Sequence, residues 1–436
     1  MRLPNWLERT IERTAYRGLL LWERLESGVA FDLLDRQYRT NPYPLYRRLR
    51  ERDPIHRSRV ADAWVFSRYA DVSTILRDPS HSADDRNRRR YEQERRRLER
   101  RGLVDPDQRP SFLRLDPPDH TRLRGLVAKA FTPRRVQELR PRIEAIVDGL
   151  LTELEAKGSV DLIHDFAVPL PVTVIAELLG IPPEDRARFR KWSDDLAGSL
   201  DANRPEILIR ARQSRQELRA YLEPIVEDRR RAPRDDLISA LVQAEEAGDR
   251  LTRDEVFSTI ILLLVAGNET TTNLIGNGLL ALLRNPDQLE RFRREPELTE
   301  NAVEELLRYD SPVQATSRIA LRDFEFQGRL IRKGQGMVLL LGAANRDPAV
   351  FPDPDRLDIG RSEIRHFSFG QGIHYCLGAP LARLEGQIAL RRLADTFDRI
   401  ELAGEPEWGE NFILHGLKRL PLRVGRTSRV AVGARG

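Results

Sequence analysis

The feature that most constrains the fold is one long helical segment between residues 251 and 283. Its apolar residues keep helical spacing, and Thr252 followed by Glu255 forms a capping box, a pattern that starts helices. The segment stops at Asn285 and Pro286, because proline cannot continue a helix. Roughly 30 residues at about 1.5 Å each make a rod of about 45 Å. A rod of that length crosses a whole domain, so the rest of the chain must be arranged around it.

The other segments predict a mainly α fold with a minor β region. Most of them show helical periodicity, and there is no internal repeat. Glycine and proline, 27 of each, are scattered rather than gathered at one boundary. We therefore expect an N-terminal extension over residues 1–40, a single large domain over 41–428 and a C-terminal tail over 429–436. The stretches that resemble strands are Ala63–Phe66, Phe324–Phe326, Met337–Leu341 and Leu420–Val424.

Composition excludes several classes of protein. With 40% hydrophobic and 32% charged residues in 436, the chain is globular and not disordered, collagen-like or a coiled-coil rod. A single cysteine, Cys376, excludes an internal disulfide and cysteine-rich zinc modules. The longest apolar run, Ile260–Gly267, is far below the roughly 20 residues that span a bilayer. We expect no transmembrane anchor and, with Glu8 and Glu12 near the N-terminus, no signal peptide, so a cytoplasmic protein.

Two charged or amphipathic segments lie outside this main pattern. Between Arg86 and Arg101 there are nine arginines and three glutamates, with Tyr91 as the only aromatic. Nucleic-acid binding would need stacking aromatics or a reading helix, so we predict a solvated surface helix and no nucleic-acid partner. The first 30 residues carry an apolar stripe and should form a helix packed on the body of the protein. Its members are Leu3, Leu7, Ile11, Ala15, Leu19, Trp22 and Leu25.

A helix lying on a membrane is the alternative for this first segment. Such a helix needs a basic polar face. Four glutamates dilute the basic charge here, namely Glu8, Glu12, Glu23 and Glu26. We therefore favour packing on the body of the protein.

The segment around the cysteine carries the strongest chemical signal. Gly370 and Gly372 permit a tight loop, Cys376 follows, and a helix begins directly after it. The helix N-terminus stabilises a thiolate, but a buried thiolate without a cation is costly. A metal that needs one strong soft donor solves this, and haem iron is such a metal. The alternative is a structural cysteine at a loop–helix junction.

The middle of the long helix breaks the rules for helices. Gly267, Asn268 and the threonines after Glu269 are mediocre or poor helix formers between strong apolar runs. Such a conflict often marks a functional site, although a polar kink is the alternative. Glu269 can relay protons from solvent, Thr270 can hold a water, and Ala266 leaves room beside the helix.

Both segments resemble motifs of the cytochrome P450 family. Phe369, Gly372, Cys376 and Gly378 match its haem signature Phe-x-x-Gly-x-x-x-Cys-x-Gly, with a histidine two residues before the cysteine as in bacterial members. The sequence 266–270 matches its oxygen-activation motif Ala-Gly-x-[Asp/Glu]-Thr. The resemblance runs from about residue 41 to 425. It implies one haem-containing domain, with haem b between the long helix and the cysteine loop.

The resemblance also implies roles for individual residues. Cys376 would be the axial thiolate, with Phe369, Gly370, Gly378 and Ala266 around the haem. A buried structural pair, Glu305 and Arg308, would be completed by Arg356 from a proline-rich loop. The haem propionates would be bound by His120, Arg124, Arg318 and His374. The predicted substrate pocket comprises Phe112, Leu113, Leu262, Val313, Ala315, Phe412 and Ile413, with Ala266.

The implied activity is that of a monooxygenase that hydroxylates or epoxidises an apolar small molecule with O₂. Glu269 and Thr270 would be its catalytic residues. Electrons would come from a ferredoxin or flavodoxin-type donor with its reductase, docked at Arg122, Arg365 and Arg383. A peroxygenase of the same fold that uses H₂O₂, and a non-enzymatic haem-thiolate sensor or electron carrier, are the alternatives.

Overall fold

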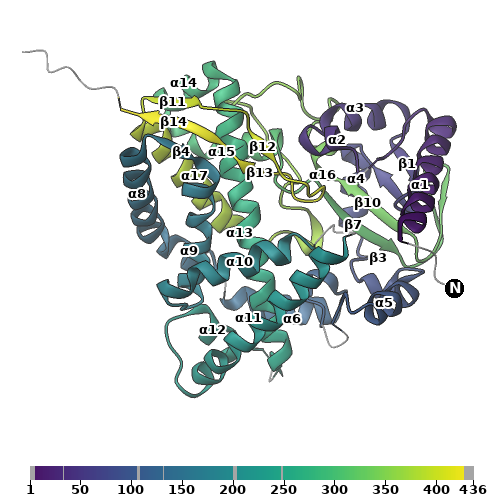
Figure 1. The fold of residues 1–436 in the computed structure, drawn as a ribbon, viewed down its shortest axis with the longest axis horizontal. Coiled ribbons are helices and arrows are strands. Elements are labelled where there is room, and N and C mark those ends of the chain that lie inside the picture. The colour runs from purple at the N-terminus through teal and green to yellow at the C-terminus, as the bar shows by residue number, and fades with distance from the viewer. Residues whose placement is uncertain are drawn as a thin grey trace, which may run out of the picture.

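The computed structural model describes residues 5–32, 34–105, 109–130, 132–199, 204–246 and 249–426. It divides into a large helical region and a smaller region built on a five-stranded sheet, at the left and right of Figure 1. Among these residues, no helix is long and apolar enough to cross a membrane. The predicted tail over 429–436 lies outside the described residues, and the boundary predicted at residue 40 stays a prediction.

Seventeen α-helices are found in the described part of the chain. They are α1 (Asn5–Ser27), α2 (Arg36–Thr40), α3 (Tyr43–Arg52), α4 (Tyr69–Arg77), α5 (Tyr91–Arg100), α6 (Asp119–Ala130), α7 (Pro133–Glu138), α8 (Arg140–Lys157), α9 (Pro169–Leu178), α10 (Arg186–Ala197), α11 (Pro205–Arg231), α12 (Leu237–Gln243), α13 (Arg253–Arg284), α14 (Pro286–Arg294), α15 (Thr299–Tyr309), α16 (Leu341–Ala344) and α17 (Ala379–Thr396).

The strands are short and form five small sheets. They are β1 (Ile55–Ser58), β2 (Ala63–Phe66), β3 (His81–Ser82), β4 (Ser159–Asp161), β5 (Glu245–Glu246), β6 (Asp249–Arg250), β7 (Ala315–Ala320), β8 (Phe324–Phe326), β9 (Arg329–Ile331), β10 (Gly336–Leu340), β11 (Arg399–Leu402), β12 (Glu407–Trp408), β13 (Leu417–Arg419) and β14 (Pro421–Gly425). The largest sheet has the order β1-β2-β10-β7-β3, and its pairs are antiparallel except β2 with β10. A second sheet has the order β11-β14-β4.

The predicted long helix is confirmed as α13, which ends before Asn285. Its capping box is present, because the Thr252 hydroxyl accepts from the Glu255 N–H and the Glu255 carboxylate accepts from the Thr252 N–H. The N-terminal half of α13 packs into an apolar cluster with α10, α11 and α12. Its C-terminal half packs into a second cluster with α8 and α17. The polar middle of the helix therefore lies between two cores.

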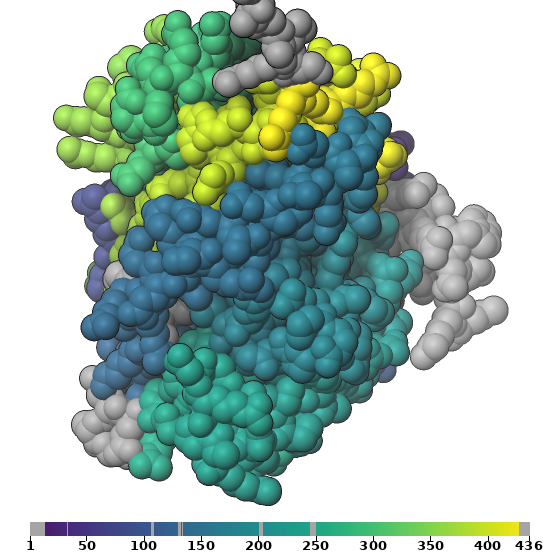
Figure 2. Space-filling model, turned by 90° about the vertical axis from the view of Figure 1, so that its left-hand side faces the viewer, coloured from purple at the N-terminus to yellow at the C-terminus, as the bar shows by residue number. Residues whose placement is uncertain are grey.

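The space around α13 is closed on the outside by other helices. In Figure 2, which shows one side of the molecule, the blue residues around α8 lie directly below the yellow C-terminal strands. The predicted strands are confirmed as β2 and β8, and as β10 and β14 with a shift of one residue. The sequence analysis missed β7, because Thr316, Ser317 and Arg318 hide its apolar pattern.

The helix predicted at the N-terminus is present as α1, but the predicted packing face is wrong. Ala15, Trp22 and Leu25 are exposed, and Leu19 is only half-buried. The side chain that enters the body of the protein is Glu23, which is 1% exposed. The reason is a group of donors from the β1–β2 hairpin, which binds a carboxylate more specifically than an apolar contact would bind a leucine.

Candidate functional site

A glycine-dependent loop holds Cys376 in front of α17. The Cys376 N–H donates to the Phe369 carbonyl at 2.9 Å, which closes the loop around the short helical turn η6 (Gly372–His374). Gly370 and Gly372 have φ angles of 68° and 74°, a region that favours glycine. A Cβ on Gly372 would clash with the carbonyl of Leu76 on α4. The loop geometry that was predicted for Gly370 and Gly372 is therefore confirmed.

The surroundings of the Cys376 thiol shift its pKa in opposite directions. Burial raises its pKa, whereas the N–H groups of Gly378 and Ala379 and the charges of Arg124 and Arg383 oppose that rise. The net pKa is raised, so the protein alone keeps the thiol protonated at neutral pH. A bound metal cation supplies the missing charge, because only the thiolate is a metal ligand. The site therefore fits a group whose metal takes one axial sulfur.

The four predicted propionate ligands lie together next to this loop. The rings of His120 and His374 are 4.3 Å apart, and the Arg124 guanidinium donates to the Tyr375 carbonyl at 2.5 Å. Burial, followed by the charges of Arg318, His120 and Arg124, lowers the pKa of His374 to about 3. Burial and Arg114 lower the pKa of Arg318 to about 10. These shifts describe a crowded, dehydrated cluster of cations.

The cluster has the properties of an anion-binding site. Both ring nitrogens of His120 are buried without a hydrogen-bond partner among the described residues. No carboxylate lies within ion-pair distance of Arg124 or Arg318 in that part of the chain. Arg114, which the sequence analysis missed, belongs to the same cluster and donates to Ser317 at 3.2 Å. A ligand with two carboxylates satisfies these groups, and the propionates of haem meet that requirement.

The middle of α13 provides the other wall of the site. Ala266 is exposed although it lies at the centre of a helix with buried residues on both sides, so it borders open space inside the helical region. The Thr270 hydroxyl donates to the Ala266 carbonyl at 2.7 Å. Burial, with a smaller contribution from Asp194 on α10, raises the pKa of Glu269 to about 7. An acid and an alcohol therefore lie on α13 next to Ala266 in the sequence, and their catalytic role stays a prediction.

A second buried acid, Glu385 on α17, was missed by the sequence analysis. Burial raises its pKa to about 8, and Thr271 on α13 opposes this with a hydrogen bond. A Cβ on the neighbouring Gly386 would lie 2.7 Å from Leu274, so α13 and α17 approach closely here. The helix that follows the Cys376 loop is therefore packed directly on the helix that carries Glu269 and Thr270. A single glutamate on a helix with an apolar face gives no signal in the sequence that its side chain is buried against another helix.

The structural ion pair is confirmed, but its predicted third member is wrong. Arg308 donates to both carboxylate oxygens of Glu305 at 2.7 and 2.8 Å, and both side chains are fully buried. Arg361, not Arg356, adds the third contact, with its Nε 3.2 Å from each Glu305 oxygen. Arg356 lies in the turn that begins at Asp353, and its side chain is exposed. The loop reverses direction after this turn and brings Arg361 back to the pair.

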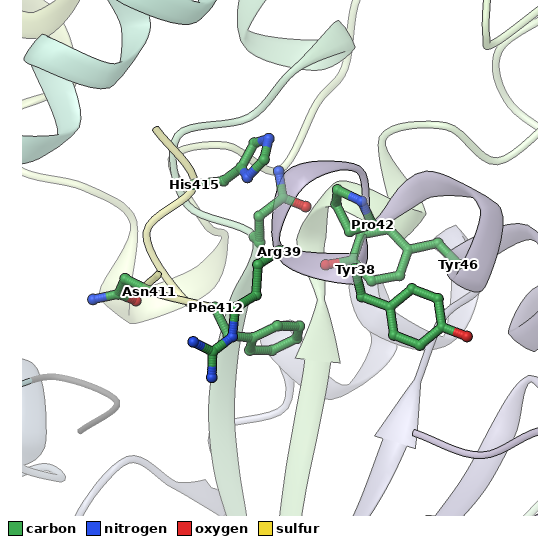
Figure 3. Close-up of a pocket in the computed structure, with 8 residues that line it drawn as sticks. Tyr38, Arg39, Pro42, Tyr46, Asn411, Phe412 and His415 are labelled. Carbon is green, nitrogen blue, oxygen red and sulfur yellow. The ribbon is translucent and has the colours of Figure 1, made fainter. Parts of the chain in front are cut away.

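The predicted pocket residues have varied surroundings. Phe112 is buried in the cluster around the N-terminal half of α13, against which Leu262 packs, whereas Leu113 is exposed. Ala315 and Val313 pack on the sheet region. Phe412 packs edge-to-face on Phe31 and lines a small crevice with Tyr38 and Arg39 (Figure 3), while the Ile413 carbonyl accepts from Gln314. Contact of these residues with a substrate stays a prediction.

Two of the three arginines predicted to dock an electron donor have internal partners. Arg122 forms an ion pair with Glu255. Arg383 donates to both oxygens of Glu304 at 2.6 and 2.9 Å. Arg365 is 77% exposed and lies 3.4 Å from Glu363. Arg365 is therefore the predicted docking residue most available to a partner.

Comparisons with known proteins agree with this geometry. The family described as Cytochrome P450 matches residues 193–408. The cytochrome P450 107B1 of Saccharopolyspora erythraea is 45% identical, over 92% of this chain and 100% of its own length. The vitamin D(3) 25-hydroxylase of Pseudonocardia autotrophica is 43% identical, over 91% of this chain and 97% of its own.

A solved structure shares the fold as well as the sequence. The cytochrome P450 PksS of the Bacillus subtilis 168 bacillaene polyketide synthase is 42% identical and has a TM-score of 0.82, over 91% of this chain and 100% of that one. The site described above has a single buried cysteine in a glycine loop, a group of basic side chains beside it, and an acid and an alcohol on α13. The chain therefore belongs to the cytochrome P450 family, and it is a haem-thiolate monooxygenase.

Proposed function

We propose that this monooxygenase hydroxylates or epoxidises a multi-ring or macrocyclic apolar molecule of the steroid or polyketide class. The observation that supports the reaction is that α17, which follows the Cys376 loop, packs on α13, which carries Glu269 and Thr270. The substrate class is suggested by relatives named for vitamin D(3) hydroxylation and for polyketide biosynthesis.

The cofactor we propose is haem b, iron protoporphyrin IX. Cys376 would supply the axial thiolate, and Arg124, Arg318, His120 and His374 would hold the two propionates. When bound, haem supplies the activation of O₂. Phe369 packs against Tyr375 within the cysteine loop, with ring centroids 6.4 Å apart, and thereby supports the position of the sulfur.

The residues of α13 would control protons at the site. With a pKa of about 7, Glu269 can both accept and release a proton at neutral pH. The Thr270 hydroxyl donates its hydrogen bond to the Ala266 carbonyl, so its oxygen lone pairs can accept a hydrogen bond from a water. Glu269 would therefore carry protons inward, and Thr270 would hold the water that delivers them.

The electron donor we propose is a ferredoxin or flavodoxin with its reductase. Arg365 supports docking of an acidic partner because it is exposed. Arg122 and Arg383 would take part only if their ion pairs with Glu255 and Glu304 rearranged.

Replacing Thr270 tests the reaction. With reductase, donor and a substrate found by ligand-induced optical shifts, T270A should keep consuming NAD(P)H but lose product by about 100-fold. S258A is the matched control, because Ser258 lies on the same helix and bonds only the Glu255 carbonyl. Equal coupling in T270A and the wild type would contradict the proposal. Full turnover with H₂O₂ alone would favour a peroxygenase, and no turnover with any donor would favour a sensor or carrier.

A further inference from the structure

We propose that the outer face of α1, together with basic residues around it, docks this protein onto an anionic lipid surface. This goes beyond the monooxygenase activity and does not depend on it. The relevant residues lie on the outside of the sheet region, where α1 covers β1 at the edge of the molecule in Figure 1.

The outer face of α1 is apolar, and no element of the described part of the chain covers it. Leu21, Trp22 and Leu25 are 58%, 53% and 78% exposed, and their spacing of three and four residues places them on one side of the helix. The opposite side contacts the body of the protein through Tyr16 and Glu23. This arrangement reverses the usual one, in which the apolar stripe of a surface helix faces the core.

In this part of α1, one acidic side chain is buried and another is paired with an arginine. Glu23 is buried and accepts hydrogen bonds from the N–H groups of Phe31, Arg59 and Val60 at 2.9, 2.6 and 3.2 Å. Glu26 is paired with the Arg59 guanidinium at 2.7 Å. Two of the four glutamates that argue against a membrane helix in the sequence therefore do not present free negative charge.

Exposed basic groups flank the apolar stripe on one side, and on the other side an arginine that is paired with Glu26 covers the Trp22 ring. Arg17 and Arg24 are exposed and lie four and three residues from Leu21, on the same flank of the helix. On the other flank, the Arg59 guanidinium lies 3.9 Å from the centre of the Trp22 ring. A tryptophan and arginines beside exposed leucines are the composition of a helix that lies in the interface of an anionic membrane.

The basic border continues from Arg59 to the arginine-rich segment before α5. Arg59 belongs to the hairpin that leads into β2, and Ala63 at the start of β2 pairs with Gly336. The Arg88 guanidinium lies beside Gly336, and the Arg89 N–H donates to the Gly334 carbonyl at 2.9 Å. These contacts place Arg88 and Arg89 beside the sheet that α1 covers, where the arginines of the hairpin are paired with Asp62 and Glu26, and the added basic charge would strengthen attraction to anionic headgroups.

The size of the patch favours lipid over a protein partner. A stable protein interface buries about 1,200 Å² or more with a central group of anchoring residues. Three exposed apolar side chains bordered by arginines are too few for that, but they suffice for shallow insertion assisted by charge.

Vesicle flotation of the full-length haem-loaded protein tests the proposal. The protein should float with vesicles of phosphatidylcholine and phosphatidylglycerol, much less with phosphatidylcholine alone, and less as salt is added. The double variant L21S/L25S should bind at least tenfold more weakly. The double variant V350S/L402S is the matched control, because Val350 and Leu402 are also exposed but lie on other elements. R17Q/R24Q should lose binding to the anionic vesicles selectively.

Three outcomes would overturn the proposal. These are no flotation with anionic vesicles, equal loss of binding in the two double variants, and equal binding to neutral and anionic vesicles. Sedimentation should show a monomer, and a dimer that L21S/L25S disrupts in the absence of vesicle binding would identify a second copy as the occupant instead. The optical spectrum of the haem should be unchanged in all variants, which separates this result from a failure of folding.

Discussion

Two arginines five residues apart, Arg356 and Arg361, illustrate how much the surroundings of a side chain matter. Arg361 is 11% exposed, contacts both oxygens of Glu305 and donates to the Pro352 carbonyl at 2.7 Å. We predict that R361A lowers the free energy of unfolding by about 1–3 kcal/mol, because it removes one of the two arginines that bind the fully buried Glu305 carboxylate. R356A should change it by less than about 0.5 kcal/mol, since that side chain is exposed.

Urea unfolding of the two variants, with the haem spectrum as a second readout, checks this prediction. R361A should also reduce haem content after purification, because the Glu305 pair supports the segment that leads to the cysteine loop. If R356A were the more destabilised variant, the assignment of Arg361 would be wrong.

At Glu269, the pKa predicts a pH dependence. Burial and, second, the like charge of Asp194 raise its pKa to about 7, and burial raises the pKa of Asp194 itself to about 6. Removing the charge in D194N favours ionised Glu269, so the pKa of Glu269 should fall. The limb of the kcat–pH profile near pH 7 should move to lower pH in D194N and disappear in E269Q. An unchanged limb in E269Q would assign it to another group.

At the scale of elements, the long helix and the cysteine loop could be predicted because their signals are local. A capping box, a proline stop and a glycine–cysteine spacing are all contained within a few residues. The third arginine of the Glu305 cluster could not be predicted, because it depends on how a loop without periodicity reverses direction. Glu385 was missed for a similar reason, since its partner Thr271 is on another helix.

The packing of α1 shows the same limit on prediction. Its helical periodicity was visible in the sequence, but the donors that bury Glu23 come from Phe31, Ser58, Arg59 and Val60. We predict that E23Q destabilises the docking of α1 by about 1–3 kcal/mol, because it weakens these hydrogen bonds. E26Q, which affects an exposed pair, should cost less than about 0.5 kcal/mol. Limited proteolysis within α1 measures both variants, and equal cleavage rates would contradict the prediction.

The same contact should depend on pH through His56. Burial lowers the pKa of His56, but hydrogen bonds to Asp53 and Glu23 outweigh burial and leave the pKa above 6.5. The contribution of His56 to stability is thus fully present below about pH 6.5 and is lost as pH rises through the folded pKa. The stability difference between wild type and H56Q should be larger at pH 6 than at pH 9. A difference that does not change with pH would show that His56 stays neutral.

At the scale of the whole molecule, the two apolar cores pack on the two ends of α13, and the residues of α13 between them are polar. The cysteine loop touches both cores, because Phe369 packs on one and Leu377 on the other, and the basic cluster of Arg114, Arg124, Arg318 and His120 surrounds His374 in that loop. In the haem-free protein this cluster destabilises the folded state, because its charges are dehydrated and repel one another. If the propionates of haem bind this cluster as proposed, haem would neutralise its charges and would contribute to the stability of the fold.

Removal of haem should therefore lower Tm markedly, and the loss should depend on the cationic cluster. A ligand present at 1,000 times its Kd stabilises the folded state by about 4 kcal/mol. In R318A the haem-free protein loses a repulsive charge, so its Tm should rise. The haem-loaded protein loses a propionate contact, so its Tm should fall. The Tm difference between the two forms should therefore become smaller. R134A is the control, because Arg134 is 89% exposed and forms an ion pair with Glu138 on its own helix, α7. Scanning calorimetry of the loaded and unloaded forms measures the effect, and an equal Tm difference in R318A and R134A would show that the cluster does not bind the cofactor.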